Sequence, residues 1–132
     1  MLVPAREPLR GVRGTRVVAR PEAIDAAVVP AGAVVLRLAP DEAFVLGAGP
    51  VQVGHDAYAI VVDDSGFSAA RLSWAEFDEL IAPLIEWPLP TDRPALAQGL
   101  IAAVPAKLWL TRDDVLLLCP AAYDDDLSER LR

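Results

Sequence analysis

Short apolar runs separated by turn signals make up most of this chain. The runs from Ala33 to Leu38 and from Ala43 to Leu46 flank Ala39-Pro40-Asp41-Glu42, where proline presets φ and the aspartate can bond to its own backbone. This pattern predicts a β-hairpin.

Two further hairpins follow from the same kind of signal. Ala57 to Val62 and Phe67 to Leu72 flank Asp63-Asp64-Ser65-Gly66, whose glycine supplies the positive φ of a tight turn. Lys107 to Thr111 and Val115 to Cys119 flank Arg112-Asp113-Asp114. The proline-rich Trp87-Pro88-Leu89-Pro90 predicts a surface crossing, after which a strand is expected within Leu96 to Val104.

Helices are expected in two places, and a brief helix or turn in a third. Ser73 and Glu76 form a capping box before an apolar face spaced three and four apart, and Pro83 ends or kinks that helix. A closing helix is expected from Ala121 to Leu131, with a buried side made of Tyr123, Leu127 and Leu131, and a brief helix or turn from Pro21 to Ala27. We therefore expect an α+β fold: an antiparallel or mixed sheet built from hairpins, with two amphipathic helices packed on one face.

The beginning of the chain has a different character. Pro4, Pro8, Gly11 and Gly14 interrupt any periodicity, so residues 1–14 are expected to be an extended basic arm, followed by a single α+β domain over residues 15–132. The chain as a whole has a net charge of −7, so this arm is basic against an acidic remainder. The residues proposed from this asymmetry to bind an acidic partner surface are Arg6, Arg10, Arg13 and Arg16; a solvated tail is the alternative.

Composition narrows the classes of partner. A net charge of −7 disfavours nucleic acid, whose phosphates it would repel. The longest apolar runs fall far short of the ~20 residues that cross a bilayer, and no apolar stretch of the signal-peptide kind follows the start. We expect no membrane partner and a cytoplasmic location. The single cysteine, Cys119, lies in an apolar run and is expected to be a buried inert thiol without a disulfide.

Groups that usually carry chemistry are scarce. His55-Asp56 could be combined with Cys119 or Ser65 as a base and nucleophile, but neither has a recognisable nucleophile context. The acidic pairs Asp63-Asp64 and Asp113-Asp114 lie in expected turns, where turn formation explains them better than metal binding. The three tryptophans are expected to pack in the core or at its rim. No catalytic and no metal-binding residue is therefore assigned.

Four parts of the sequence carry a resemblance to a known family: residues 36–42, residues 62–66 with 70–73, residues 97–105 and residues 123–127. Through them the sequence from Val34 to Leu131 resembles the γ subunit of heterotetrameric sarcosine oxidase, a relative of the tetrahydrofolate-binding domains of the glycine-cleavage T protein and YgfZ.

The resemblance implies a noncatalytic accessory or partner-binding subunit, beside other chains that bind flavin and folate. No cofactor is assigned to this chain; tetrahydrofolate is implied only through the resemblance. The alternative is a free-standing module that binds a folate-like small molecule, and a homo-oligomer stays open.

Overall fold

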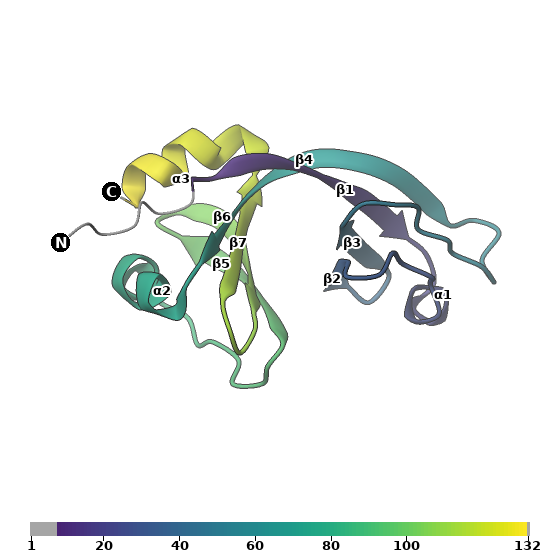
Figure 1. Cartoon of the computed structure of the whole chain (residues 1–132), viewed down its shortest axis with the longest axis horizontal. Helices are drawn as coiled ribbons and strands as arrows, with labels where there is room; N and C mark the ends of the chain where they lie inside the picture. Colours follow the sequence, from purple (N-terminus) through teal and green to yellow (C-terminus); the bar gives the residue numbers. More distant parts are fainter. Residues whose placement is uncertain (1–7, 132) are drawn as a thin grey trace. The chain divides into compact units, whose positions relative to one another are not determined.

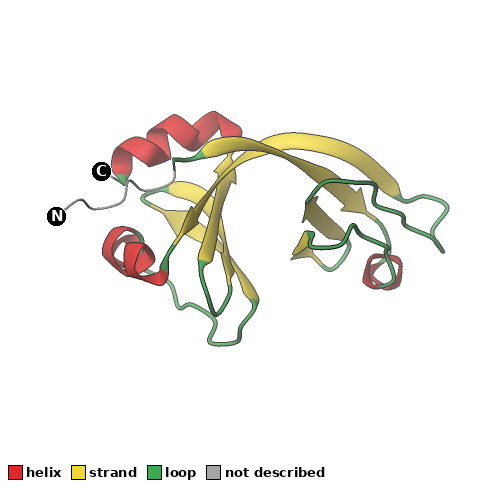
Figure 2. Cartoon of the chain, in the orientation of Figure 1, coloured by secondary structure: helices red, strands yellow, loops and turns green. Residues whose placement is uncertain are grey.

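The computed structural model describes residues 8–131, which form strands and short helices grouped into two compact units (Figures 1 and 2). The smaller unit is Val12–Ser65, and the larger unit contains residues 8–11 and 66–131. The elements in chain order are β1 (Arg10–Val18), α1 (Pro21–Asp25), β2 (Val34–Ala39), β3 (Glu42–Leu46), β4 (Ile60–Leu72), α2 (Trp74–Leu80), β5 (Ala95–Ile101), β6 (Val104–Leu110), β7 (Val115–Pro120) and α3 (Asp124–Arg130), with 3-10 turns at Ala82–Leu84 and Ala121–Tyr123.

The smaller unit is built on antiparallel strands in the order β2-β3-β1, and it includes residues 60–65 of β4, the next strand in the sheet. The hairpin predicted around residues 39–42 is confirmed as β2 and β3. Side chains alternate between the two faces of a strand, so the register places Val17, Ala43 and Val45 on one face. Ala23 and Ile24 of α1 are buried in the same apolar cluster. Helix α1 begins at Pro21, where the fixed φ suits the first turn.

Strand β1 begins at Arg10, before the boundary predicted near Thr15. Gly14 is a packing position in this strand, because a Cβ there would lie 2.4 Å from Cζ of Phe44 and 2.6 Å from the carbonyl oxygen of Val45. The glycine that looks like loop punctuation in sequence thus makes room for a fully buried ring. Residues 10–14 of the expected arm therefore belong to this strand. Residues 1–7 of the arm lie outside the described part of the chain. The single domain expected over 15–132 stays a prediction.

The larger unit is an antiparallel sheet in the order β4-β7-β6-β5, to which β4 contributes its second half. The register puts Ala97, Leu108 and Leu117 side by side on one face. That face carries the main apolar core, and both α2 and α3 pack into it. Their buried contributions are Phe77 from α2, Ile81 just after it, Leu127 from α3 and Leu131 at its end.

The capping box of α2 is confirmed. The amide of Glu76 donates to Oγ of Ser73 at 3.1 Å, and the amide of Ser73 donates to Oε1 of Glu76 at 2.9 Å. The helix gives way to a 3-10 turn that contains Pro83, as expected. The closing helix is also found, but its buried side is shorter than predicted, since Tyr123 is 44% exposed.

The hairpin predicted around residues 63–66 is wrong. Strand β4 runs without interruption from Ile60 to Leu72. A turn signal is local, whereas this strand lies between two neighbouring strands, β1 on one side and β7 on the other. Arg16 of β1 also bonds Asp64 at 2.9 Å and so neutralises a carboxylate that local preference would place in a turn. Tertiary pairing overrides the turn propensity here.

A hairpin that the sequence did not predict joins β5 to β6. Its turn residues, Ala102 and Ala103, have φ values of 49° and 67°. Such angles are usually marked by glycine or asparagine, so two alanines give no signal. The expected strand within Leu96 to Val104 is found, but the chain reverses near its end. The hairpin of β6 and β7 is confirmed.

The fold is therefore mostly antiparallel sheet with few short helices, richer in strand than the α+β layout expected from sequence. Every strand pair whose register is known is antiparallel. Across residues 8–131, no helix is both long and apolar enough to span a membrane.

Candidate functional site

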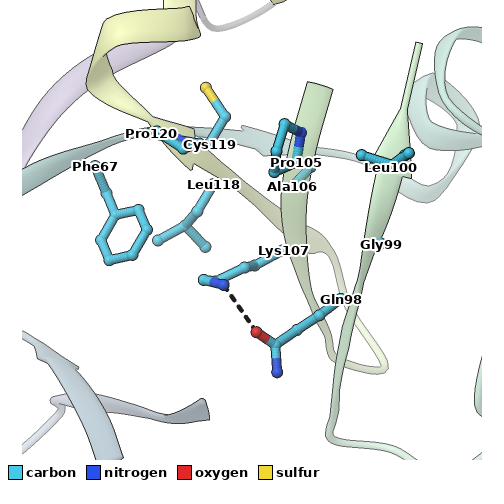
Figure 3. A pocket seen from close by; sticks show the side chains of 10 residues that line it. All are labelled: Phe67, Gln98, Gly99, Leu100, Pro105, Ala106, Lys107, Leu118, Cys119 and Pro120. Atoms are coloured by element: carbon cyan, nitrogen blue, oxygen red, sulfur yellow. Dashed lines mark hydrogen bonds between the residues drawn. The ribbon is translucent and has the colours of Figure 1, made fainter. Parts of the chain in front are cut away.

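A cavity of about 350 Å³ opens on the face of the larger unit's sheet that carries Gln98, Lys107 and Leu118 (Figure 3). These three side chains share a face because they are Cα partners across β5, β6 and β7. The cavity is lined by Phe67, Gln98, Gly99, Leu100, Pro105, Ala106, Lys107, Leu118, Cys119 and Pro120.

The polar edge of the cavity is formed by the only lysine of the chain. Nζ of Lys107 donates to Oε1 of Gln98 at 2.8 Å and lies 5.8 Å from the centre of the Phe67 ring. Cation, amide and aromatic ring together suit a small molecule with an anionic group and an apolar body. Lys107 and Cys119 are nucleophilic by residue type, but Nζ of Lys107 is bonded to Gln98 and the thiol of Cys119 is buried, so the arrangement favours binding over reaction.

Cys119 borders this cavity, but its thiol belongs to the core. Figure 3 shows its sulfur pointing away from Lys107 and Gln98, and the residue is buried in the apolar cluster. Burial, followed by the nearby negative charge of Asp124, raises the pKa of the Cys119 thiol to about 11. The same carboxylate accepts a 2.8 Å hydrogen bond from the hydroxyl of the buried Ser68. The burial that the sequence predicts for the Cys119 thiol is confirmed.

We expect Cys119 to react with a disulfide reagent at pH 8 about 100-fold more slowly in the folded chain than in urea. The thiolate is the reactive form, and a rise of its pKa from 9.0 to about 11 lowers the thiolate fraction by that factor, before restricted access slows it further. Stopped-flow absorbance in native buffer and in urea gives the ratio. Equal rates would show that the thiol is accessible and not raised in pKa.

The histidine and aspartate that sequence analysis considered as a catalytic pair hold a turn together. Oδ2 of Asp56 accepts from the amide of Arg20 at 2.8 Å, and Oδ1 accepts from the amide of Tyr58 at 2.9 Å. These two bonds, that of Arg20 first, hold the pKa of Asp56 below its usual value. His55 has φ of 64°, and its carbonyl accepts from the guanidinium of Arg20. Within residues 8–131 no hydrogen bond joins His55 to Ser65 or Cys119.

One member of each acidic pair, Asp64 and Asp114, has a structural partner. Arg16 bonds both Glu42 and Asp64. Asp114 accepts from the guanidinium of Arg71 at 3.0 Å and, through Oδ1, from the hydroxyl of Thr111 at 2.9 Å. In the described residues, no cluster of three or more histidine, cysteine or acidic side chains could hold a metal ion.

The four arginines expected to bind a partner are in different situations. Arg10 and Arg13 lie exposed on β1. Arg16 is half-buried and engaged with Glu42 and Asp64 of its own unit. Arg6 lies outside the described residues. Arg10 and Arg13 are thus the members of this group that are exposed in the part that the structure describes, and partner binding by the four arginines stays a prediction.

Two tryptophans pack at the rim of the larger unit's core, as expected. The indole of Trp74 donates to the carbonyl of Thr111 at 3.0 Å and meets the Phe77 ring edge-on at 5.3 Å. The indole of Trp87 donates to the carbonyl of Leu100 at 2.9 Å and fills the space where Gly99 lacks a side chain. Both donors are satisfied by backbone, which favours a packing role over a ligand platform.

The cavity was not predicted from the sequence. Phe67, Gln98 and Lys107 belong to three different strands, and their meeting depends on the register of β5 against β6. The only sequence signal was the alternation of polar and apolar residues in β5 and β6, which gains meaning once the turn at Ala102 and Ala103 is known.

Comparison with known proteins gives a likeness in structure. No family model and no curated protein sequence matches the chain. A solved structure described as heterotetrameric sarcosine oxidase from Corynebacterium sp. U-96, in complex with pyrrole 2-carboxylate, contains a chain that superposes with a TM-score of 0.67 at 17% sequence identity. The superposition covers 93% of this chain and 79% of that one. The resemblance found in sequence is thus confirmed at the level of the fold: this chain has the fold of a heterotetrameric sarcosine oxidase chain.

Proposed function

We propose that this chain is a noncatalytic subunit that assembles with flavin-binding subunits into an amine oxidase of the sarcosine oxidase type, in the place of the γ subunit. The observation that carries the proposal is the fold shared with a chain of that heterotetrameric enzyme over 93% of this chain. Since 79% of the other chain is also covered, the likeness is to a chain of comparable size, not to one domain of a much longer subunit.

The side chains of the described residues support a role without catalysis. The thiol of Cys119 is buried and raised in pKa, and Asp56 is engaged with two backbone amides. In the cavity beside Lys107, the amine of that lysine is bonded to Gln98, which favours holding a ligand over reacting with it.

Co-expression tests the proposal. The chain is produced with the flavin-binding oxidase subunits encoded nearest to it, with an affinity tag on one of those subunits. We expect the chain to co-elute in a fixed ratio through affinity and size-exclusion columns, and the isolated chain to show no oxidation of sarcosine or similar amines. Elution of the chain alone, or steady turnover by the isolated chain, would contradict the proposal.

A second candidate is a small-molecule module that uses the cavity beside Lys107. Its volume of about 350 Å³ lies in the range of known ligand sites, and an anionic group near Nζ with a ring near Phe67 would suit it. Calorimetry with tetrahydrofolate separates the candidates. We expect weak or no binding, and micromolar affinity that is lost in Lys107→Ala would favour the module.

Replacing Arg10 and Arg13 together by alanine should slow association with the flavin-binding subunits several-fold at low salt. Both side chains are exposed, so stability should change by about 0.5 kcal/mol or less. The difference from wild type should shrink as salt rises, because exposed charges are screened within about 8 Å at physiological ionic strength. Surface plasmon resonance at several salt concentrations measures it, and exposed Arg112→Ala in the β6–β7 turn is the control. An unchanged association rate with the same salt dependence would show that these arginines are solvated and do not contact the partner.

A further inference from the structure

Three consecutive apolar residues at the start of β4 are exposed to solvent. Ile60 is 52% exposed, Val61 40% and Val62 49%, and Tyr58 just before them is 92% exposed. Successive side chains of a strand point to opposite faces, so exposure of all three means that both faces of β4 are partly open to solvent at this point. In the second half of the same strand, residues 67–70 are all buried.

One edge of β4 is also unpaired over these residues. The strand lies beside β1, and its pairing with β7 on the other side begins only at Phe67, opposite Pro120. In the described part of the chain no strand pairs with Ile60–Val62 on that side. Exposed edges are normally protected by lysine, proline or a bulge, because free amides and carbonyls recruit other strands. Ile60–Val62 has none of these protections.

We propose that the free edge of β4 at Ile60–Val62 is a docking site for an extended strand of another polypeptide, one with apolar side chains and a lysine or arginine. This inference rests on the proposed assembly and names the surface used for it. Main-chain hydrogen bonds would continue the sheet, while apolar side chains of the added strand cover Ile60 and Val62 on one face and Val61 on the other.

The negative charge of Asp63 indicates that the added strand carries a basic residue. Asp63 follows the apolar residues directly, is exposed, and forms no ion pair with any described residue. Asp64 is already paired with Arg16. A basic residue opposite Asp63 would complete the strand pair, since opposite charges across a strand pair are stabilising. A second copy of this chain fits poorly, because residues 57–66 contain no lysine or arginine to place opposite Asp63 and because two molecules of net charge −7 repel each other.

A synthetic peptide tests the edge without any knowledge of the natural partner. The probe is a fluorescent eight-residue peptide that alternates valine with lysine or threonine, and its matched control carries N-methyl groups on alternate amides. We expect saturable binding of the first peptide in fluorescence anisotropy and at least a tenfold loss with the second. No binding up to about 1 mM, or equal binding of the two peptides, overturns the proposal.

Variants locate the site. Val61→Asp should weaken binding of the valine–lysine–threonine peptide at least tenfold, because a carboxylate is then placed in the apolar contact. Val28→Asp is the control, since Val28 is 63% exposed in the same unit and its backbone pairs with Gln52 and not with β4. Circular dichroism checks that both variants fold. If Val61→Asp does not fold, Ile60→Thr is used in its place. Equal loss in variant and control overturns the proposal, as does self-association of wild type that Val61→Asp abolishes.

The co-expressed oxidase subunits separate the two proposals. If the peptide binds the edge but no subunit co-elutes, the edge is confirmed as a docking site and the assembly proposed above fails. If subunits co-elute equally well with wild type and Val61→Asp, and the peptide does not bind, the assembly stands and the edge proposal is overturned.

Discussion

Replacing Phe77 by alanine is expected to lower the free energy of unfolding of the larger unit by about 3–5 kcal/mol. The ring is 2% exposed and anchors α2 in the core formed with β5, β6 and β7. The cost combines the lost transfer free energy of the ring with the cavity left behind, since the strands around it are fixed by their hydrogen bonds. Against a typical total of about 5–15 kcal/mol, this is a large fraction.

Urea unfolding followed by tryptophan fluorescence measures the effect. Trp74 lies 5.3 Å from Phe77 and reports on this core. Tyr58→Ala is the control, because that ring is 92% exposed and its removal should change stability by about 0.5 kcal/mol or less. A loss below about 1 kcal/mol for Phe77→Ala would show that α2 is not held as described.

Replacing Gly14 by alanine should destabilise the smaller unit by about 1–3 kcal/mol, although alanine normally suits a strand better than glycine. The added Cβ would lie 2.4 Å from the Phe44 ring and 2.6 Å from the carbonyl oxygen of Val45, and a backbone oxygen cannot swing aside. The ring is fully buried, so its movement disturbs its neighbours.

Gly11→Ala is a matched control in the same strand, because a Cβ there meets nothing within 4 Å. It should leave stability unchanged or raise it by up to about 1 kcal/mol. Thermal and urea unfolding of the two variants side by side give the difference. Equal effects at both positions would mean that Phe44 does not lie over Gly14.

The parts of the fold that were predictable depend on local chemistry. The capping box of α2 involves two residues three apart in sequence, and the turn between β2 and β3 consists of Pro40 and Asp41 themselves. Both signals lie within a few residues of the structure that they determine.

The parts that were not predictable depend on distant residues or on unmarked backbone angles. Strand β4 passes through a turn-like segment because β1 and β7 pair with it, and Arg16 binds Asp64 from far away in sequence. The turn at Ala102 and Ala103 takes positive φ without glycine. The cavity is lined by residues of the two hairpins that share β6, β5–β6 and β6–β7, so it could not be found before the register of these strands was known.

The most direct test of the central claim is native mass spectrometry of the flavin-binding oxidase subunits co-expressed with and without this chain. The account predicts an intact complex whose mass includes this chain, with no amine oxidation by the chain on its own. It also predicts a smaller or incomplete assembly when the chain is left out. A complete and fully active oxidase that forms without this chain, together with a chain that remains alone in solution, would contradict the account.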